Sequence, residues 1–225
     1  MNPYNMKKTE MQLFLTGYCK HRMPYRQHPK CYEKEIGENP KIGVFDIETA
    51  WGFNADSGFM LCYVLKEYHK NKIYSACITK KDVDAYLQYD ISIDKRISSI
   101  LVKDLKVFDV IVTFNGTRFD IPYSRTRLLK HGLDFPKYGY IKHIDLYYLV
   151  KYKLKLHRNS LESACRLFGI EGKNHVDFEI WQRASFGDEK ALEYIFDHCK
   201  RDVSKCTEKL YDKIVDYARK TNRSI

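Results

Sequence analysis

The stretch Lys41-Ile-Gly-Val-Phe-Asp46-Ile-Glu48-Thr49 decides the fold. Its apolar residues are typical of a buried β-strand. In a strand, residues two apart point to the same face, so Asp46 and Glu48 project together while Phe45 and Ile47 pack on the other side. Two neighbouring carboxylates beside a buried strand need a positively charged partner. Taken alone, such a pair could lie on a solvated strand edge, but the hydrophobic flanks favour a cation site.

The segments that follow predict a mixed sheet covered by helices. Residues 59–66 and 72–79 are rich in β-formers, as expected for antiparallel neighbours of the first strand. Two short apolar runs predict further strands at residues 109–114 and 141–146. Helical spacing occupies residues 91–105, 119–130 and 188–220. Three antiparallel strands, followed by alternating helices and strands that extend the sheet in parallel, predict an α/β fold with a mixed β-sheet flanked by helices.

The size and charge of the chain restrict its class. At 225 residues it has room for one substantial core, which we assign to residues 39–220, preceded by an extension at residues 1–38. The formal net charge of +10 favours a polyanionic partner, and nucleic acid is the commonest of these. The 18 tyrosines include more rings than a core needs, which suits stacking on unpaired bases.

Two further acidic motifs lie downstream. In the segment Thr113-Phe-Asn115-Gly-Thr-Arg-Phe-Asp120, a strand ends in a turn and Asp120 enters the first turn of a helix. In the last helix, the spacing of four places His198 and Asp202 on one face. Taken alone, Asp120 could simply stabilise a helix N-terminus, and His198 with Asp202 could be a surface ion pair. Their order along the chain makes the combination informative.

An Asp-x-Glu-Thr strand, then Asn-x-x-x-Phe-Asp at a strand-to-helix junction, then a His four residues before an Asp in a late helix resembles the three motifs of the DEDD-type exonucleases of the ribonuclease H-like superfamily. The resemblance spans about residues 41–218. Within that superfamily the chain looks most similar to predicted stand-alone exonucleases related to the proofreading domains of family B DNA polymerases. The resemblance implies a divalent-metal-dependent 3′–5′ exonuclease acting on single-stranded nucleic acid.

Two Mg²⁺ or Mn²⁺ ions are implied by the resemblance, held by Asp46, Glu48, Asp120 and Asp202. In this allocation Asp46 bridges both ions, and His198, neutral near pH 7, takes a proton from water. Position 198 departs from the family pattern. The tyrosine branch of the superfamily has three residues between Tyr and Asp and the histidine branch has four, whereas this chain has His with the tyrosine-branch spacing. Asp197 occupies the position that the histidine-branch spacing would give to His.

Five residues near the motifs are candidates for contact with the substrate: Thr49, Asn115, Arg118, Phe119 and Asp145. For Asp145 the alternative is a residue that starts a helix, and for Asn115 one that shapes the turn. The basic run at residues 151–158 is either a solvated face or a phosphate track. Preference for DNA or RNA is not readable from these residues.

The extension carries a different set of candidate metal ligands, namely Cys19, His21, His28 and Cys31. Two close Cys/His pairs could complete a tetrahedral Zn²⁺ site, and a segment this polar would have difficulty folding without one. The five other cysteines, Cys62, Cys77, Cys165, Cys199 and Cys206, fall in strand or helix patterns and are expected in the core.

Two other functions remain open. One is an endonuclease of the wider ribonuclease H-like class, and the other is a nucleic-acid-binding module without turnover. The first residues lack an apolar leader, and no run approaches the roughly 20 apolar residues of a membrane span. With seven cysteines, an odd number, we expect reduced thiols and a cytoplasmic protein.

Overall fold

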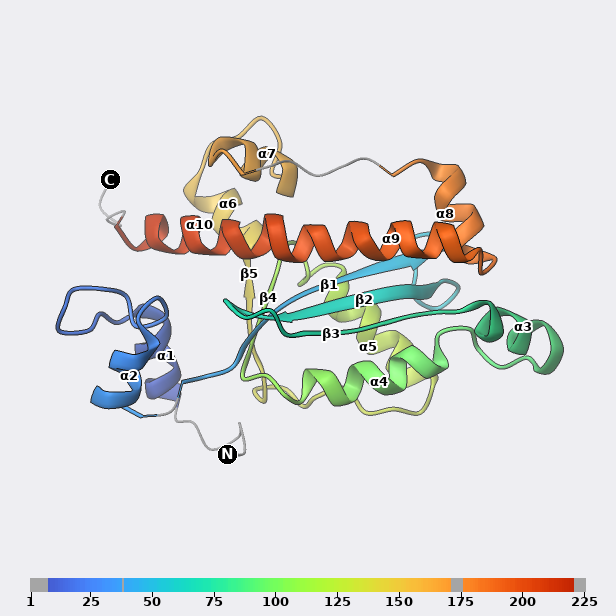
Figure 1. Cartoon of the computed structure of the whole chain (residues 1–225), viewed down its shortest axis with the longest axis horizontal. Coiled ribbons are helices and arrows are strands. Elements are labelled where there is room, and N and C mark those ends of the chain that lie inside the picture. Colours follow the sequence, from blue (N-terminus) through green and yellow to red (C-terminus); the bar gives the residue numbers. More distant parts are fainter. Residues whose placement is uncertain (1–7, 38, 171–175, 221–225) are drawn as a thin grey trace.

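A computed structural model describes residues 8–37, 39–170 and 176–220 (Figure 1). Its strands are β1 (Ile42–Ala50), β2 (Phe59–Glu67), β3 (Ile73–Cys77), β4 (Val110–Thr113) and β5 (Lys142–Asp145). The helices up to β5 are α1 (Lys8–Thr16), α2 (Pro29–Glu35), α3 (Lys80–Tyr89), α4 (Lys95–Leu105) and α5 (Asp120–Lys130). Those after β5 are α6 (Leu146–Lys153), α7 (Leu161–Leu167), α8 (Phe178–Ser185), α9 (Glu189–Arg201), the π-helical turn η2 (Asp202–Thr207) and α10 (Glu208–Lys220).

The five strands form one mixed sheet in the order β3-β2-β1-β4-β5. β1 pairs antiparallel with β2, and β2 with β3, whereas β4 and β5 extend the sheet in parallel. The β1–β2 register places Asp46 opposite Val64 and Glu48 opposite Cys62. β1 is therefore the central strand, and the predicted mixed sheet is confirmed.

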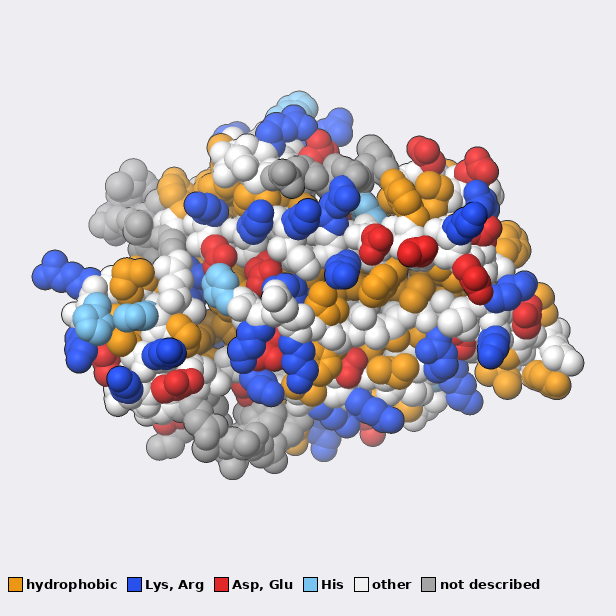
Figure 2. Space-filling model, viewed as in Figure 1, with side chains coloured by type: hydrophobic (Ala, Val, Ile, Leu, Met, Phe, Trp, Pro, Cys, Tyr) orange, Lys and Arg blue, Asp and Glu red, His pale blue; other side chains and the backbone are white. Residues whose placement is uncertain are grey.

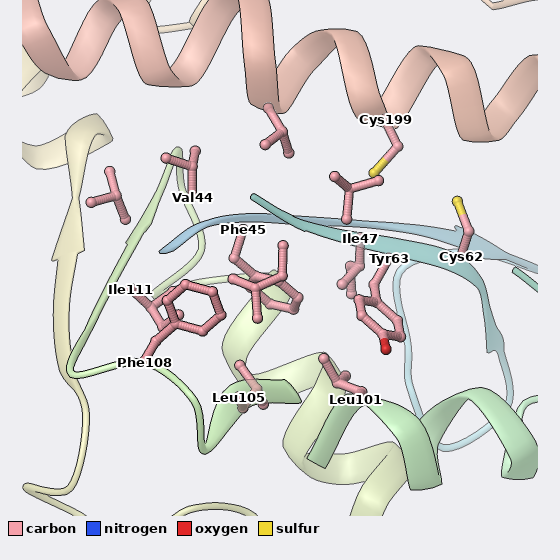
Figure 3. Packing of buried hydrophobic residues seen from close by; sticks show 14 of the residues in the cluster. Val44, Phe45, Ile47, Cys62, Tyr63, Leu101, Leu105, Phe108, Ile111 and Cys199 are labelled. Carbon is pink, nitrogen blue, oxygen red and sulfur yellow. The ribbon is translucent and has the colours of Figure 1, made fainter. Parts of the chain in front are cut away.

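Helices cover both faces of this sheet. α4 and α5 lie on one face, where Phe45 and Tyr63 pack against Leu101 and Leu105 (Figures 1 and 3). The long helix formed by α9, η2 and α10 crosses the other face, with Cys199 pointing toward the sheet. The helix predicted for residues 188–220 is thus confirmed, although a π-helical turn interrupts it. Because β1 alternates, Asp46 and Glu48 point toward this long helix.

The extension forms an arm of two short helices, α1 and α2, joined by the loop at residues 17–28. Arg26 in this loop is 2% exposed and binds the rest of the chain. Its Nη1 donates to the Tyr68 hydroxyl at 3.1 Å and lies 3.6 Å from an Asp212 carboxylate oxygen. The guanidinium also lies over the Tyr211 ring, with its carbon 5.3 Å from the ring centroid. A buried arginine thus anchors the arm to the residue that follows β2 and to α10.

Some elements were not anticipated from the sequence. The arm helices, α3 and α8 carry no apolar pattern long enough to predict them, and α3 depends on a capping box between Thr79 and Asp82. The helix predicted at residues 91–105 begins only at Lys95. The reason is that Asp94 turns its carboxylate inward to Arg127 and His131.

The surface over the long helix is mixed in charge. Figure 2 shows Asp and Glu side chains over much of α9 and Lys and Arg side chains over the rest of the helix, where the exposed basic residues are Lys200, Arg201, Lys205, Lys209 and Lys213. Within the part of the chain that the structure describes, no helix is long and apolar enough to cross a membrane.

Candidate active site

The carboxylates of β1 meet the long helix at the middle of the sheet. His198 Nε2 lies 3.8 Å from Glu48 Oε1 and 3.7 Å from Asp202 Oδ2. The His198 side chain is 5% exposed and that of Asp202 is 1% exposed, whereas that of Glu48 retains 13%. The prediction that His198 and Asp202 lie on one face of the helix is therefore confirmed. The His198 side chain on this face points toward Glu48 of β1.

The backbone is irregular at both elements. The β1–β2 register shifts between Glu48 and Thr49, which bends the strand at the end of the acidic pair. The π-helical turn begins at Asp202. Such turns widen a helix by one residue and are frequent at functional sites. Neither irregularity is visible in the sequence pattern.

Asp120 joins the site from the first turn of α5. It opens α5, is 3% exposed, and its Oδ1 accepts the backbone N–H of Ile47 at 3.1 Å. Burial raises the pKa of the Asp120 carboxyl to about 6, although hydrogen bonds with Ile47 and with Asp46 limit the rise. The four carboxylates predicted from the sequence thus gather from β1, α5 and the long helix.

A cation fits this donor set. Buried carboxylates repel one another unless a positive charge lies between them, and carboxylate oxygens are the ligands that Mg²⁺ and Mn²⁺ prefer. Asp46, Glu48 and Cys199 each offer one ligand atom, and these atoms lie within 4.8 Å of one another. The arrangement can therefore hold a divalent metal ion at Asp46 and Glu48.

Cys199 was expected only as a core residue. It is buried, and its thiol lies 3.6 Å from the Asp46 carbonyl oxygen and 3.7 Å from Asp46 Oδ2. Burial raises the pKa of the Cys199 thiol, so the group is a proton donor to Asp46 at neutral pH. In the sequence, the only indication that Cys199 lies at the site is its position directly after His198 in the late helix.

Asp145 holds the loop that leads to Asp120. One of its carboxylate oxygens accepts the backbone N–H groups of Asn115 at 2.7 Å and Tyr147 at 3.0 Å, and the other accepts that of Thr117 at 2.9 Å. Asn115 has a φ of 66°, a left-handed conformation that Asn tolerates better than most residues. Asp145 therefore both starts α6 and shapes the turn, and it positions the loop through backbone contacts.

An aromatic pocket lies beside Asp120. It has a volume of about 310 Å³ and is lined by Phe53, Arg118, Phe119 and Tyr123, among other residues. The Phe53 and Phe119 rings are 5.8 Å apart, and Phe53 is 84% exposed. Phe53 was not anticipated, because a single Phe in a polar loop carries no periodic signal. The structure brings Arg118 and Phe119 together here, in the two positions that precede Asp120.

The arm brings its four candidate ligands together as predicted. Cys19 Sγ is 3.4 Å from His28 Nδ1 and 3.8 Å from His21 Nδ1, and Cys31 Sγ is 3.4 Å from His21 Nδ1. Tetrahedral Zn²⁺ with ordinary bond lengths separates a sulfur and a nitrogen ligand by about 3.6 Å. Burial raises the pKa of the Cys19 thiol, but hydrogen bonds from His28 and from backbone N–H groups outweigh it and lower the pKa to about 6. The cluster fits a metal ion.

Comparison with known proteins identifies the fold family. Residues 44–215 match the model of the RNase_H superfamily. A DNA polymerase of Methanocaldococcus jannaschii is 32% identical over 127 residues, which cover 48% of this chain and 8% of that protein. The family B DNA polymerase of the hyperthermophilic archaeon Pyrobaculum calidifontis has a similar structure, with a TM-score of 0.61 and 15% identity over 83% of this chain and 28% of that one. The chain thus spans a small part of both polymerases, and it belongs to the RNase_H superfamily.

Proposed function

We propose that this protein is a divalent-metal-dependent 3′–5′ exonuclease that hydrolyses phosphodiester bonds of single-stranded nucleic acid. The observation that carries the proposal is the convergence of carboxylates from three elements. Glu48 and Asp202 flank His198, Asp46 offers a ligand atom next to that of Glu48, and Asp120 is hydrogen-bonded to Asp46 and to the Ile47 N–H. Membership of the RNase_H superfamily and the similarity to DNA polymerases support the same class of chemistry. Direction of digestion, preference for single strands and a cytoplasmic location are part of the proposal.

The residues of the site have separate tasks in this proposal. Asp46, Glu48, Asp120 and Asp202 hold the cations, for which two Mg²⁺ or Mn²⁺ ions are the candidates. Such cations, when bound, stabilise negative charge on the phosphate and on the leaving oxygen. His198, between Glu48 and Asp202, accepts the proton of the attacking water. Asp120 is fixed by the Ile47 N–H, so its carboxylate keeps one orientation.

The aromatic pocket suits the terminal nucleotide. Phe53 and Phe119 offer ring faces and edges to an unpaired base, and Arg118 offers a charge for a phosphate. Asn115 stands at the turn before this pocket, and Thr49 follows Glu48 at the bend of β1. We assign contact with the substrate to Thr49, Asn115, Arg118 and Phe119, and a positioning role to Asp145.

End-labelled oligonucleotides with Mg²⁺ or Mn²⁺ test this function. A 5′-labelled single strand that shortens one nucleotide at a time, with release of a 3′ label at the first step, is the expected result. Internal cuts that leave long labelled fragments would make the protein an endonuclease. Binding without any cleavage would make it a nucleic-acid-binding module.

His198→Ala should lower kcat by roughly 10²- to 10⁴-fold, because a positioned proton acceptor contributes about that much. His198→Tyr should recover part of the loss, since Tyr stands at this spacing in one branch of the similar exonucleases. Single-turnover cleavage measures both, and Glu193→Ala, at an exposed residue of the same helix, is the control. An unchanged kcat in His198→Ala would mean that the ring only fills space.

For the arm we propose one structural Zn²⁺ held by Cys19, His21, His28 and Cys31. The support is the set of sulfur–nitrogen distances, which match tetrahedral coordination. The loop between the ligands also carries Arg26, so a metal ion here would keep the buried arginine in place.

Metal analysis of the purified protein should find one zinc per chain, and Cys31→Ser should reduce it to a trace, because three ligands bind Zn²⁺ far more weakly than four. Cys77→Ser, at a half-buried cysteine outside the arm, should leave the zinc content unchanged. Wild-type protein that carries no zinc when prepared without chelator, and takes up none on addition, would rule the site out.

A further inference from the structure

α6 combines aromatic and basic side chains and begins directly after Asp145. Tyr148 and Tyr152 stack with their rings nearly parallel, 13° apart and 6.1 Å between centroids. Lys151 Nζ lies 5.5 Å from the centre of the Tyr152 ring and 5.9 Å from that of Tyr147. Tyr152 is 71% exposed, so one face of this pair is open to a ligand.

The rings form a continuous series that starts at the end of β4. The ring centroids of Phe114 and Tyr147 are 6.2 Å apart, and those of Tyr147 and Tyr148 are 5.4 Å apart. Tyr148 in turn stacks on Tyr152. Asp145 fixes where the series begins, because it binds the backbone N–H of both Asn115 and Tyr147. The series therefore leads outward from the turn that precedes Asp120.

The segment is also purely basic. From Leu146 to Leu161 the sequence has no Asp or Glu, and it contains Lys151, Lys153, Lys155 and Arg158. All four are exposed, and none forms an ion pair with a residue in the described ranges. Figure 2 shows basic side chains gathered over α6 and α7. Unneutralised positive charge over sixteen consecutive residues attracts a polyanion.

We propose that this surface, Tyr147 to Arg158, holds the single-stranded nucleic acid whose 3′ end enters the acidic site. The inference rests on the proposed function and adds the path of the strand. Stacked tyrosines need unpaired bases, because a duplex hides the faces of its bases. The lysines and Arg158 bind phosphates without regard to sequence. An acidic peptide would satisfy the charges but would leave the ring faces without a partner.

Fluorescence anisotropy with a labelled thymidine oligonucleotide of about 12 nucleotides, without added divalent cation, tests the surface. Lys153→Ala/Lys155→Ala/Arg158→Ala should weaken binding and reduce the slope of log K against log[salt] by about 2, since each phosphate contact contributes roughly 0.7 for a single strand. Tyr152→Ala should weaken binding about 10-fold, and Tyr152→Phe, which keeps the ring, should not.

The matched control is Lys95→Ala/Lys103→Ala/Lys106→Ala, on and just after α4 at the opposite face of the sheet. It should leave both affinity and salt slope unchanged. The proposal would be overturned if the Lys153/Lys155/Arg158 triple variant kept the wild-type salt slope. It would also be overturned if a glutamate peptide of equal length bound as tightly as the oligonucleotide.

Cleavage of a dinucleotide separates this inference from the proposed function, because so short a substrate reaches only the acidic site. If the triple variant and Tyr152→Ala cleave the dinucleotide at the wild-type rate but bind the oligonucleotide more weakly, both the exonuclease and the binding surface are supported. If these substitutions weaken binding but the wild type cleaves no substrate, the binding surface is retained and the exonuclease activity is rejected. If the wild type cleaves its substrates and the substitutions leave binding unchanged, only the proposed binding surface is rejected.

Discussion

Asp202→Asn should lower metal-dependent cleavage by about 10³-fold or more, which is the largest effect on activity that we expect. Asp202 is 1% exposed and faces His198, so its carboxylate cannot be replaced by a neighbouring group or by bulk water. An amide keeps the shape of the side chain but loses the charge that holds a cation. Single-turnover digestion of a 5′-labelled oligonucleotide measures the loss.

The same variant should not lose stability. Without metal, the buried carboxylates repel one another, so removal of one negative charge should leave the melting temperature of the metal-free protein unchanged or raise it by a few degrees, on the order of 1 kcal/mol. Asp197→Asn is the matched control, since Asp197 is exposed and lies on the same helix. Full activity in Asp202→Asn, or equal loss in Asp197→Asn, would contradict the assignment.

The largest effect on stability should come from Asp94→Ala, at about 3–5 kcal/mol. Asp94 is fully buried and accepts two hydrogen bonds from Arg127 at 2.7 Å each, one from His131 at 2.8 Å and one from the Met60 backbone at 3.0 Å. Its removal leaves a buried arginine without a counter-charge. Urea unfolding measures the change in the free energy of unfolding.

Glu162→Ala is the comparison for this prediction. Glu162 pairs with Arg166 on the surface, where the side chains are 51% and 77% exposed. A surface pair of this kind contributes roughly 0.5 kcal/mol. If both variants lost the same small amount, the buried cluster would not be a main determinant of stability.

The Asp94 cluster also predicts how stability depends on pH. Burial alone would raise the pKa of the Asp94 carboxyl, but hydrogen bonds from His131 and Arg127 lower it to about 2. A group with a lowered pKa in the folded state stabilises above its unfolded pKa, near 3.9, and loses that contribution as the pH falls toward 2. The stability gap between wild type and Asp94→Asn should therefore narrow by about 2 kcal/mol between pH 5 and pH 2. A constant gap would contradict this account.

Much of the candidate site was predictable because its main elements are local patterns. The alternation around Asp46 and Glu48 predicts a shared face, the turn after Thr113 predicts Asp120 at a helix start, and the spacing of four joins His198 to Asp202. These patterns involve neighbours in the sequence. The structure confirms the arrangement of the side chains, and their chemical roles stay predictions.

The contacts that complete the site were not predictable, because they join distant parts of the chain. The Asp145 carboxylate reaches Asn115 across 30 positions, and Cys199 meets Asp46 across 153. The π-helical turn at Asp202 depends on how the long helix packs on the sheet. Asp94 looked like part of a helix, and only the inward positions of Arg127 and His131 explain why the helix starts later.

The most direct test of the central claim is digestion of a 5′-labelled single-stranded oligonucleotide by wild type and Asp46→Asn, each with Mn²⁺ and with EDTA. We predict stepwise shortening from the 3′ end by the wild type with Mn²⁺, and an intact strand in the three other reactions. Shortening by Asp46→Asn at the wild-type rate, or an intact strand in all four reactions, would contradict a metal-dependent exonuclease built on these carboxylates.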